Sequence, residues 1–406
     1  MQFSQLGLDP RLLQALAENN YHETTPIQAA AIPEILQGQD VLAGAQTGTG
    51  KTAAFILPVL QRLLQQDENA LAPVVGVRAL VLVPTRELAQ QVHKNAKKYA
   101  KHTDLKAVQV YGGVSIDQQI STIKQGADIL IATPGRLLDL IFKKAVDLRP
   151  LQTLIFDEAD RMLDMGFADE IKNILRRLPA QRQSLLFSAT LDNSIFNFSK
   201  NLLNKPKLIE VAARNATAEQ VQQIVYNVDN ERKRALTAYM IGSKNWQQVL
   251  IFTRTKQSAD ELAAELQKDG LSAQSFHADK TQYMRETALA EFKSGALRVL
   301  VATDVAARGI DISQLKYVIN YELPYVAEDY IHRIGRTGRA GESGLAISLM
   351  DESENYLLEE IEALLDTKLN QQWYEGFEPD LNKEREPLQK NSKAAQKRRF
   401  KQRHKK

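Results

Sequence analysis

The 406-residue sequence contains no cysteine, and this absence excludes disulfide bonds and thiolate metal sites. Its six histidines show none of the paired spacings typical of a metal centre. No apolar run is long enough to cross a bilayer, and Met1–Asp9 lacks the basic and apolar segments of a secretory signal. We therefore expect a cytoplasmic protein that does not bind a membrane.

The length indicates two or three domains, and a composition of 44% hydrophobic and 25% charged residues is typical of a globular protein. The net charge of +3 is unevenly distributed. Residues 381–406 hold 11 Lys and Arg against 2 Glu, a balance of +9, so the preceding residues carry 3 − 9 = −6. So basic a segment, with few large apolar residues, is predicted to be disordered and to bind nucleic acid.

Short runs of Val, Ile and Leu recur along the chain, and each ends in a polar cluster. This pattern predicts buried parallel strands whose functional groups lie at their carboxyl ends. The runs are residues 41–43, 79–83, 129–132, 154–156, 185–187, 224–228, 249–252, 299–302, 318–321 and 345–349. Helical patterns such as 87–100 and 167–178 separate them, so we predict an α/β fold of doubly wound sheets.

Breaks in the strand pattern predict the domain boundaries. We expect a first domain over residues 1–211 and a second over 220–370, joined by a linker at 212–219 that has no apolar periodicity. Residues 371–406 are expected to form the disordered basic tail.

Residues 45–52 read Ala-Gln-Thr-Gly-Thr-Gly-Lys-Thr after an apolar run, as in a phosphate-binding loop, although Ala45 replaces the usual glycine. Glycines let backbone N–H groups face a polyphosphate, and the N-terminus of a helix beginning near Lys51 favours its charge. Lys51 is predicted to reach the β and γ phosphates and Thr52 to bind Mg²⁺. The nucleotide-binding residues predicted here are Gln46, Thr47, Gly48, Thr49, Gly50, Lys51 and Thr52.

An ordinary strand-to-helix turn could carry the same loop sequence, but a second element favours catalysis. The apolar run 154–156 ends at Asp157 and Glu158, which suits a strand that delivers a carboxylate for Mg²⁺ and a neighbouring base. Together the two elements predict a nucleoside triphosphatase. Mg²⁺ carried by the nucleotide is the metal that we expect.

A basic cluster at residues 332–339 reads His-Arg-Ile-Gly-Arg-Thr-Gly-Arg. Arg336 and Arg339 lie three apart, so a helical turn would place both guanidinium groups on one side, where they could bind phosphate. A surface helix with salt bridges is the alternative, but Gly335 and Gly338 disfavour a helix and indicate close backbone approach. We predict two arginine fingers that couple hydrolysis to domain closure.

In their order and spacing, these motifs resemble those of the DEAD-box RNA helicases of superfamily 2, over roughly residues 3–349. Residues 157–160, Asp-Glu-Ala-Asp, spell the family's name. The resemblance implies two tandem RecA-like domains and RNA-dependent ATP hydrolysis with local strand separation. The short basic tail resembles that of small bacterial members such as the RhlE type.

The resemblance also implies roles for individual residues. Gln28, in Thr25-Pro26-Ile27-Gln28, would recognise adenine, and Tyr21 would stack on it. Asp157 would order Mg²⁺, and Glu158 would orient or deprotonate the attacking water. Asp160 and His332 would join the domains around that water. Ser188 and Thr190 would link hydrolysis to unwinding, or would simply cap a helix. Asp311 would bind ribose.

Polar groups at the remaining strand ends suit an RNA backbone, and contacts to phosphate and sugar would make binding tolerant of sequence. The RNA-binding residues predicted are Pro84, Thr85, Arg86, Gly112, Gly113, Thr133, Gly135, Arg136, Thr253, Arg254, His277 and Thr303. An ATP-gated RNA clamp or assembly scaffold is an alternative function, and a DNA translocase matches the motifs less well. The sequence leaves open which RNA is bound, the oligomeric state, and whether ribosomal or RNA-decay proteins are partners.

Overall fold

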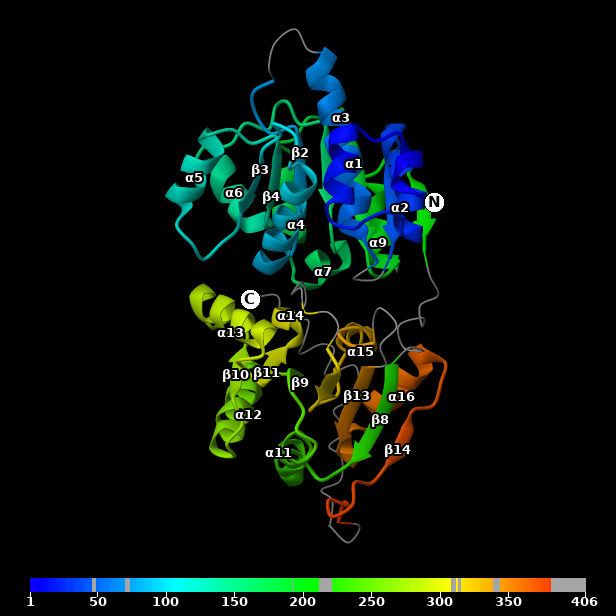
Figure 1. Cartoon of the computed structure of the whole chain (residues 1–406), viewed down its shortest axis with the longest axis vertical. Coiled ribbons are helices and arrows are strands. Elements are labelled where there is room, and N and C mark those ends of the chain that lie inside the picture. Colours follow the sequence, from blue (N-terminus) through cyan, green and yellow to red (C-terminus); the bar gives the residue numbers. More distant parts are fainter. Residues whose placement is uncertain are drawn as a thin grey trace. The chain divides into compact units, whose positions relative to one another are not determined.

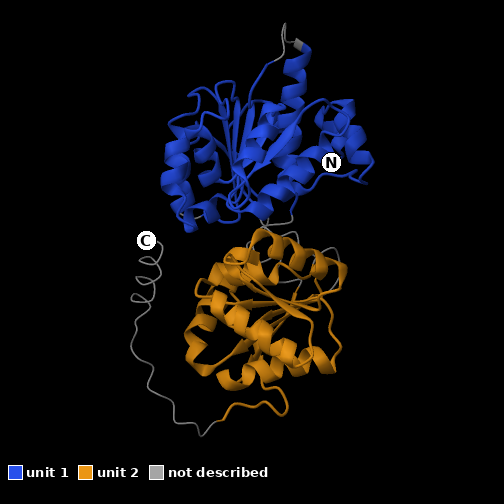
Figure 2. Cartoon of the chain, turned by 90° about the vertical axis from the view of Figure 1, so that its left-hand side faces the viewer, with its two compact units in different colours: residues 1–212 blue, residues 213–406 orange. Residues whose placement is uncertain are grey.

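The computed structural model of the chain describes residues 1–45, 49–69, 74–191, 193–211, 221–307, 312, 315–338 and 344–380. They belong to two compact units, residues 1–212 and 213–406 (Figure 2). The predicted linker, residues 212–219, and the basic segment 381–406 lie outside the described residues. No helix in the described part of the chain is both long and apolar enough to span a bilayer.

Unit 1 contains a seven-stranded parallel sheet with the strand order β3-β4-β2-β5-β6-β1-β7 (Figure 1). Its strands are β1 (Val41–Gly44), β2 (Ala79–Leu82), β3 (Ala107–Val110), β4 (Ile129–Ala132), β5 (Thr153–Phe156), β6 (Gln183–Ser188) and β7 (Lys207–Glu210). One face packs against α1 (Pro10–Ala17), α2 (Pro26–Leu36), α3 (Lys51–Asn69) and α4 (Arg86–Tyr99), with the short η1 (Phe3–Leu6). The other face packs against α5 (Ile116–Lys124), α6 (Pro134–Phe142), α7 (Ala159–Asp164), α8 (Ala168–Leu175) and α9 (Asn193–Lys200).

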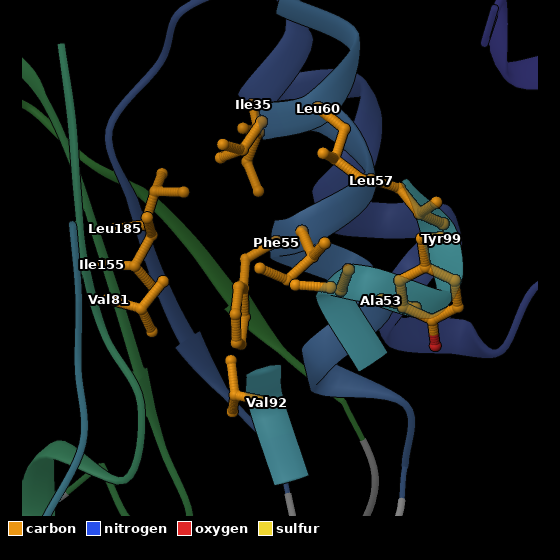
Figure 3. Packing of buried hydrophobic residues seen from close by; sticks show 14 of the residues in the cluster. Ile35, Ala53, Phe55, Leu57, Leu60, Val81, Val92, Tyr99, Ile155 and Leu185 are labelled. Atoms are coloured by element: carbon orange, nitrogen blue, oxygen red, sulfur yellow. The ribbon is translucent and has the colours of Figure 1, made fainter. Parts of the chain in front are cut away.

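The core explains why the central strands are apolar along their whole length. Val81, Ile155 and Leu185, from neighbouring strands, are fully buried and lie beside Phe55 of α3 (Figure 3). Their neighbours along the strands are buried against the opposite helices. Because both faces of the sheet are covered, the strand ends are held in fixed positions, and these ends carry the predicted functional groups.

Unit 2 repeats the topology of unit 1. Its parallel sheet has the order β10-β11-β9-β12-β13-β8-β14, and subtracting seven from each number gives the order of unit 1. The strands are β8 (Val221–Asn227), β9 (Val249–Thr253), β10 (Ala273–Phe276), β11 (Val299–Thr303), β12 (Tyr317–Asn320), β13 (Gly344–Met350) and β14 (Asn370–Gln372). The helices are η2 (Asn230–Arg232), α11 (Lys233–Ser243), α12 (Lys256–Lys268), α13 (Gln282–Ser294), α14 (Asp304–Ala307), α15 (Ala327–Ile334), η3 (Glu352–Glu354) and α16 (Asn355–Leu365).

The predicted start of the tail at residue 371 is wrong, because residues 371–380 belong to unit 2. Strand β14 crosses that boundary and pairs with β8. Tyr374 then packs edge-on against Tyr226, with ring centroids 5.1 Å apart. Arg232 donates hydrogen bonds of 2.6 Å to the carbonyl of Gly376 and 3.1 Å to that of Glu378. The pattern escaped prediction because β14 is a short polar edge strand.

Candidate nucleotide and nucleic-acid site

The predicted nucleotide-binding groups gather at the carboxyl ends of three adjacent strands, β5, β6 and β1. Lys51 is the first residue of α3, after the loop that follows β1, and its buried Nζ donates to the carbonyl of Ala45 at 2.8 Å. Thr52 follows on the same turn and is half-buried. Gln46, Thr47 and Gly48 lie outside the described residues.

The adenine motif is joined to this loop by Gln28. Its Nε2 donates to the carbonyl of Gly50 at 3.1 Å, and its Oε1 accepts from the backbone N–H of Thr25 at 2.9 Å. Gly50 has φ +94°, and a Cβ at this position would collide with the Gln28 amide, so only glycine allows the contact. Tyr21 is 42% exposed, and the Nζ of Lys98 lies over its ring, 4.6 Å from the centroid.

Asp157, directly after β5, has the chemistry expected of a metal ligand. Its side chain is buried, and its Oδ1 has no hydrogen-bond partner in the described part of the chain. Burial raises the pKa of this carboxyl to about 7, although Lys51 opposes the shift. A buried carboxylate oxygen without a donor fits a hard cation such as Mg²⁺, with the Thr52 hydroxyl as a second oxygen ligand.

Glu158 is held in an unusual conformation beside it. The residue has φ +54° at the N-terminus of α7, in the left-handed region that non-glycine residues seldom adopt. Its carboxylate lies 3.3 Å from the guanidinium of Arg161, and both side chains are buried. The left-handed backbone therefore sets Glu158 apart from the helical residues of α7 that follow it.

The Asp-Glu-Ala-Asp and Ser-Ala-Thr segments are in contact. Asp160 Oδ2 accepts from the backbone N–H of Ala189 at 3.2 Å and from the Thr190 hydroxyl at 3.4 Å. The carbonyl of Ser188 in turn accepts from the N–H of Ala45 at 3.0 Å. The alternative of a simple helix cap does not apply, since α9 begins only at Asn193.

The predicted RNA residues of unit 1 follow the other three adjacent strands, β3, β4 and β2. The Thr85 hydroxyl caps α4 by accepting from the N–H of Leu88 at 3.3 Å. The Arg86 guanidinium lies so close to Gly113, which has φ +81°, that a Cβ there would collide with it. Pro84, Gly112, Thr133 and Gly135 lie in the loops and helix starts at the same edge.

Arg136 reaches the same glycine loop from α6. Its guanidinium donates to Gln119 Oε1 at 2.9 Å and to the carbonyl of Val114 at 3.0 Å. Gln119 also donates to the carbonyl of Tyr111 at 3.1 Å and is buried. Sequence reasoning missed Gln119, whose role becomes visible only when α5 and α6 are placed side by side.

In unit 2, Thr253 and Thr303 end the paired strands β9 and β11 in register, and both are buried. His277 Nε2 lies 3.0 Å from Asp260 Oδ1. The Arg254 side chain forms an ion pair with Glu354 and lies over the ring of Tyr325, 4.8 Å from its centroid. Arg254 therefore has protein partners, and its RNA-binding role stays a prediction.

Helix α15 ends at Ile334 with Gly335 as its C-cap, and the N–H of Arg336 donates to the carbonyl of Arg333 at 3.2 Å in the turn that follows. The expected close backbone approach is present: Gly338 has φ +69°, and a Cβ on Gly344 would collide with the Gly338 backbone. Arg336 is buried, and His332 Nδ1 lies 4.0 Å from Asp329 Oδ1. Arg339 and Asp311 lie outside the described residues.

Arg333 is a buried anchor that the sequence did not reveal. Its Nε and Nη2 donate to the two carboxylate oxygens of Asp304 at 2.6 and 2.7 Å, and Nη1 donates to the carbonyl of Glu322 at 2.6 Å. These bonds fix α15 to the ends of β11 and β12. They also fix the backbone that leads to Arg336.

In unit 2, the lysine that corresponds in position to Lys51 already has a carboxylate partner. Lys233 begins α11 after the first strand of its sheet, as Lys51 begins α3. Its Nζ lies 2.5 Å from Glu354, and burial lowers the pKa of the ammonium to about 8. An ion pair with a carboxylate leaves this lysine unsuited to a phosphate, so Lys51 of unit 1 stays the predicted phosphate-binding lysine.

Comparison with known families gives two matches, to DEAD/DEAH box helicase over residues 25–198 and to the helicase conserved C-terminal domain over residues 231–341. The chain is a member of the DEAD-box helicase family. It is 40% identical over 394 residues to ATP-dependent RNA helicase CshA of Listeria monocytogenes, which covers 96% of this chain and 74% of the relative. ATP-dependent RNA helicase RhlB of Xanthomonas axonopodis is 42% identical over 370 residues, 90% of this chain and 65% of the relative.

A solved structure described as S. cerevisiae Dbp5 bound to RNA and ADP BeF3 matches with a TM-score of 0.81 and 30% identity. The match covers 91% of this helicase and 95% of the other chain. The predicted family and the two tandem RecA-like domains are thereby confirmed. The narrower likeness to the RhlE type stays a prediction.

Proposed function

We propose that this chain is an ATP-dependent RNA helicase, the activity named for its relatives, and that it separates short RNA duplexes or remodels RNA–protein complexes. The observation that supports the proposal is that one edge of the unit 1 sheet carries two sets of functional groups. The ends of β5, β6 and β1 carry the nucleotide groups, and the ends of β3, β4 and β2 carry the groups suited to an RNA backbone. ATP and RNA would thus bind to one rigid body side by side.

The nucleotide half uses residues of unit 1. Gln28 and Tyr21 would recognise adenine, while Lys51 and the N-terminus of α3 would hold the phosphates. Thr52 and Asp157 would hold Mg²⁺, which when bound would neutralise phosphate charge. Glu158 would then orient or deprotonate the attacking water.

The coupling follows from the contact between Asp160 and the Ser-Ala-Thr segment, whose first residue is bonded to the nucleotide loop through Ala45. A change at the phosphates can therefore reach this segment through two hydrogen-bonded steps. In the closed state of the reaction, Arg336 and Arg339 would contact the γ-phosphate, His332 would approach Asp160, and Asp311 would bind the ribose. RNA held by both units would be bent in that state, and hydrolysis would release it.

The experiment that tests this proposal is steady-state ATP hydrolysis with single-stranded RNA, with DNA of the same sequence, and without nucleic acid. We expect stimulation by RNA alone. Glu158→Gln should lower turnover by about 10²–10⁴-fold while nucleotide binding persists, because a general base contributes that much. Glu170→Gln on α8 is the matched control and should behave as the wild type.

Equal stimulation by DNA, or no stimulation, would contradict the proposal. A duplex-separation assay then distinguishes the two RNA functions, since an ATP-gated clamp or scaffold would hydrolyse ATP with RNA without separating strands. A cytoplasmic location belongs to the proposal as well. Ribosomal and RNA-decay proteins are the classes of partner to examine first.

A further inference from the structure

The outer face of α4 carries a row of lysines outside the site described above. Lys97 and Lys98 follow Lys94 by three and four residues, and Lys101 lies just after the helix. With Glu18 and Asn19 they line an open cavity of about 550 Å³. Lys94, Lys97 and Lys101 are exposed, and Lys98 is half-buried.

This row continues a stripe that begins at the RNA edge of the sheet. Successive helical residues turn by about 100°, so steps of three or four return to the same side. Arg86, Gln90, Lys94, Lys97 and Lys101 follow each other in such steps, whereas the buried apolar residues of α4 lie on the other side. From Arg86 to Lys97 the stripe runs roughly 17 Å along the helix axis.

Part of the positive charge in this stripe and beside it has protein partners. Lys101 Nζ lies 2.7 Å from Glu18, and Lys98 lies over the Tyr21 ring. In the described part of the chain, neither Lys94 nor Lys97 has a hydrogen bond or ion pair from its side chain. Like charges three or four residues apart repel, so the stripe weakens α4 unless an anion covers it.

The composition of the stripe favours a nucleic acid over a protein as that anion. Protein interfaces are depleted of lysine and depend on aromatic and arginine anchors, whereas Lys94 and Lys97 are the exposed charged side chains of this row on α4. A lysine is a flexible point charge that accepts phosphate without fixed geometry. Residues 1–380 carry a balance of −6, so a local excess of lysines is unlike the rest of the two units.

We propose that RNA extending beyond the core site passes Arg86 and continues along α4, where Lys94 and Lys97 bind its phosphates. The proposal rests on the proposed RNA function and adds a second, flanking segment to it. At about 3.4 Å per nucleotide of a helical strand, the stripe would accept roughly five nucleotides. Because the stripe leads away from the core site in one direction, it extends the binding site for one end of the strand alone.

The test compares three single-stranded RNAs on the full chain: one of core length, and two longer by about a dozen nucleotides at the 5′ or the 3′ end. Binding is measured over a range of salt concentrations for the wild type and for the double variant Lys94→Gln, Lys97→Gln. The control is Lys143→Gln, Lys172→Gln, which removes the same charge from the C-cap of α6 and from α8, on the opposite face of the sheet.

We expect the Lys94→Gln, Lys97→Gln variant to lose affinity for only one of the two extended RNAs. For that RNA the slope of log affinity against log salt should become shallower by about 1.4, since each single-strand phosphate contact contributes about 0.7. Equal losses for both extensions, no loss, or the same loss in the control would overturn the proposal. If the core-length RNA fails to bind or to stimulate the wild-type ATPase, the proposed function itself fails, so the two failures are distinguishable.

Discussion

One buried carboxylate of unit 1, that of Asp157, differs from the buried ion pairs of unit 2. In unit 2, Arg333 forms an ion pair with Asp304, and Lys233 forms one with Glu354. In unit 1, Asp157 keeps a carboxylate oxygen without a donor in the described part of the chain. A buried charge without a partner is costly, so it persists where a ligand completes it. The carboxylate oxygen of Asp157 that has no donor therefore favours a bound cation in unit 1.

The raised pKa of Asp157 predicts a pH dependence of stability in the absence of nucleotide. Burial moves this pKa from 3.8 to about 7, so between those values the folded protein binds a proton that the unfolded chain has released. The contribution of Asp157 to stability is therefore complete below about pH 4 and is lost as the pH rises to about 7. The loss amounts to about 4 kcal/mol, at roughly 1.4 kcal/mol per pH unit.

Urea unfolding of the full chain and of its Asp157→Asn variant, followed by far-ultraviolet circular dichroism between pH 4.5 and 8, measures this dependence. Asp157→Asn cannot titrate, so the wild type should lose stability relative to the variant as the pH rises. A difference between the two proteins that stays constant with pH would show that Asp157 titrates as an exposed carboxyl does.

The residues that sequence reasoning found are those inside short motifs. Lys51, Asp157 and Ser188 follow apolar strands, and a strand end can be recognised from its own sequence. Gln119 and Arg333 have partners 17 and 29 residues away, Arg136 and Asp304. Their roles depend on which helix lies beside which strand, and no local pattern carries that information.

At the scale of elements, the strands that the sequence did not reveal are β3, β7, β10 and β14, which form the two edges of each sheet. Central strands are covered on both faces and read as apolar runs. An edge strand has one open side and tolerates polar residues, as in β7, whose burial pattern is exposed except at Ile209. The ten inner strands were therefore predictable, and the sheet edges were not.

Because Arg333 fixes α15 to the sheet, we expect its replacement to lower the stability of unit 2. Replacing it with Gln leaves Asp304 without its charged partner, and loss of one member of such a buried pair costs about 3–5 kcal/mol. Arg234→Gln removes a half-exposed ion pair with Asp269 and should cost less than about 1 kcal/mol.

Tryptophan fluorescence measures this effect on unit 2 specifically. The chain has two tryptophans, Trp246 and Trp373, and both lie in unit 2. Trp246 is buried and stacked on Tyr317 at 4.4 Å, so its emission should change when the unit unfolds. Equal denaturation midpoints for the two variants would mean that Arg333 and Asp304 are not coupled as the structure indicates.

At the scale of the whole molecule, the basic segment 381–406 and residues 1–380 carry net charges of opposite sign. Without this segment the chain's net charge changes from +3 to 3 − 9 = −6, so a weak attraction for RNA becomes a repulsion. Residues 371–380 must be kept in such an experiment, because β14 and the contacts of Tyr374 belong to the sheet of unit 2. The structure thus places the cut after Asp380 rather than after residue 370.

Truncation after Asp380 should flatten the salt dependence of RNA affinity and leave ATP hydrolysis without RNA unchanged, since the segment contributes counterion release but no nucleotide contact. A tail with the same residues in scrambled order is the matched control and should restore the wild-type slope, because a tether that binds phosphates is indifferent to sequence. RNA titrations at several salt concentrations give both slopes. An unchanged slope after truncation would mean that residues 1–380 alone determine the salt dependence of RNA affinity. A scrambled tail that fails to restore the wild-type slope would mean that the tail recognises RNA through its sequence.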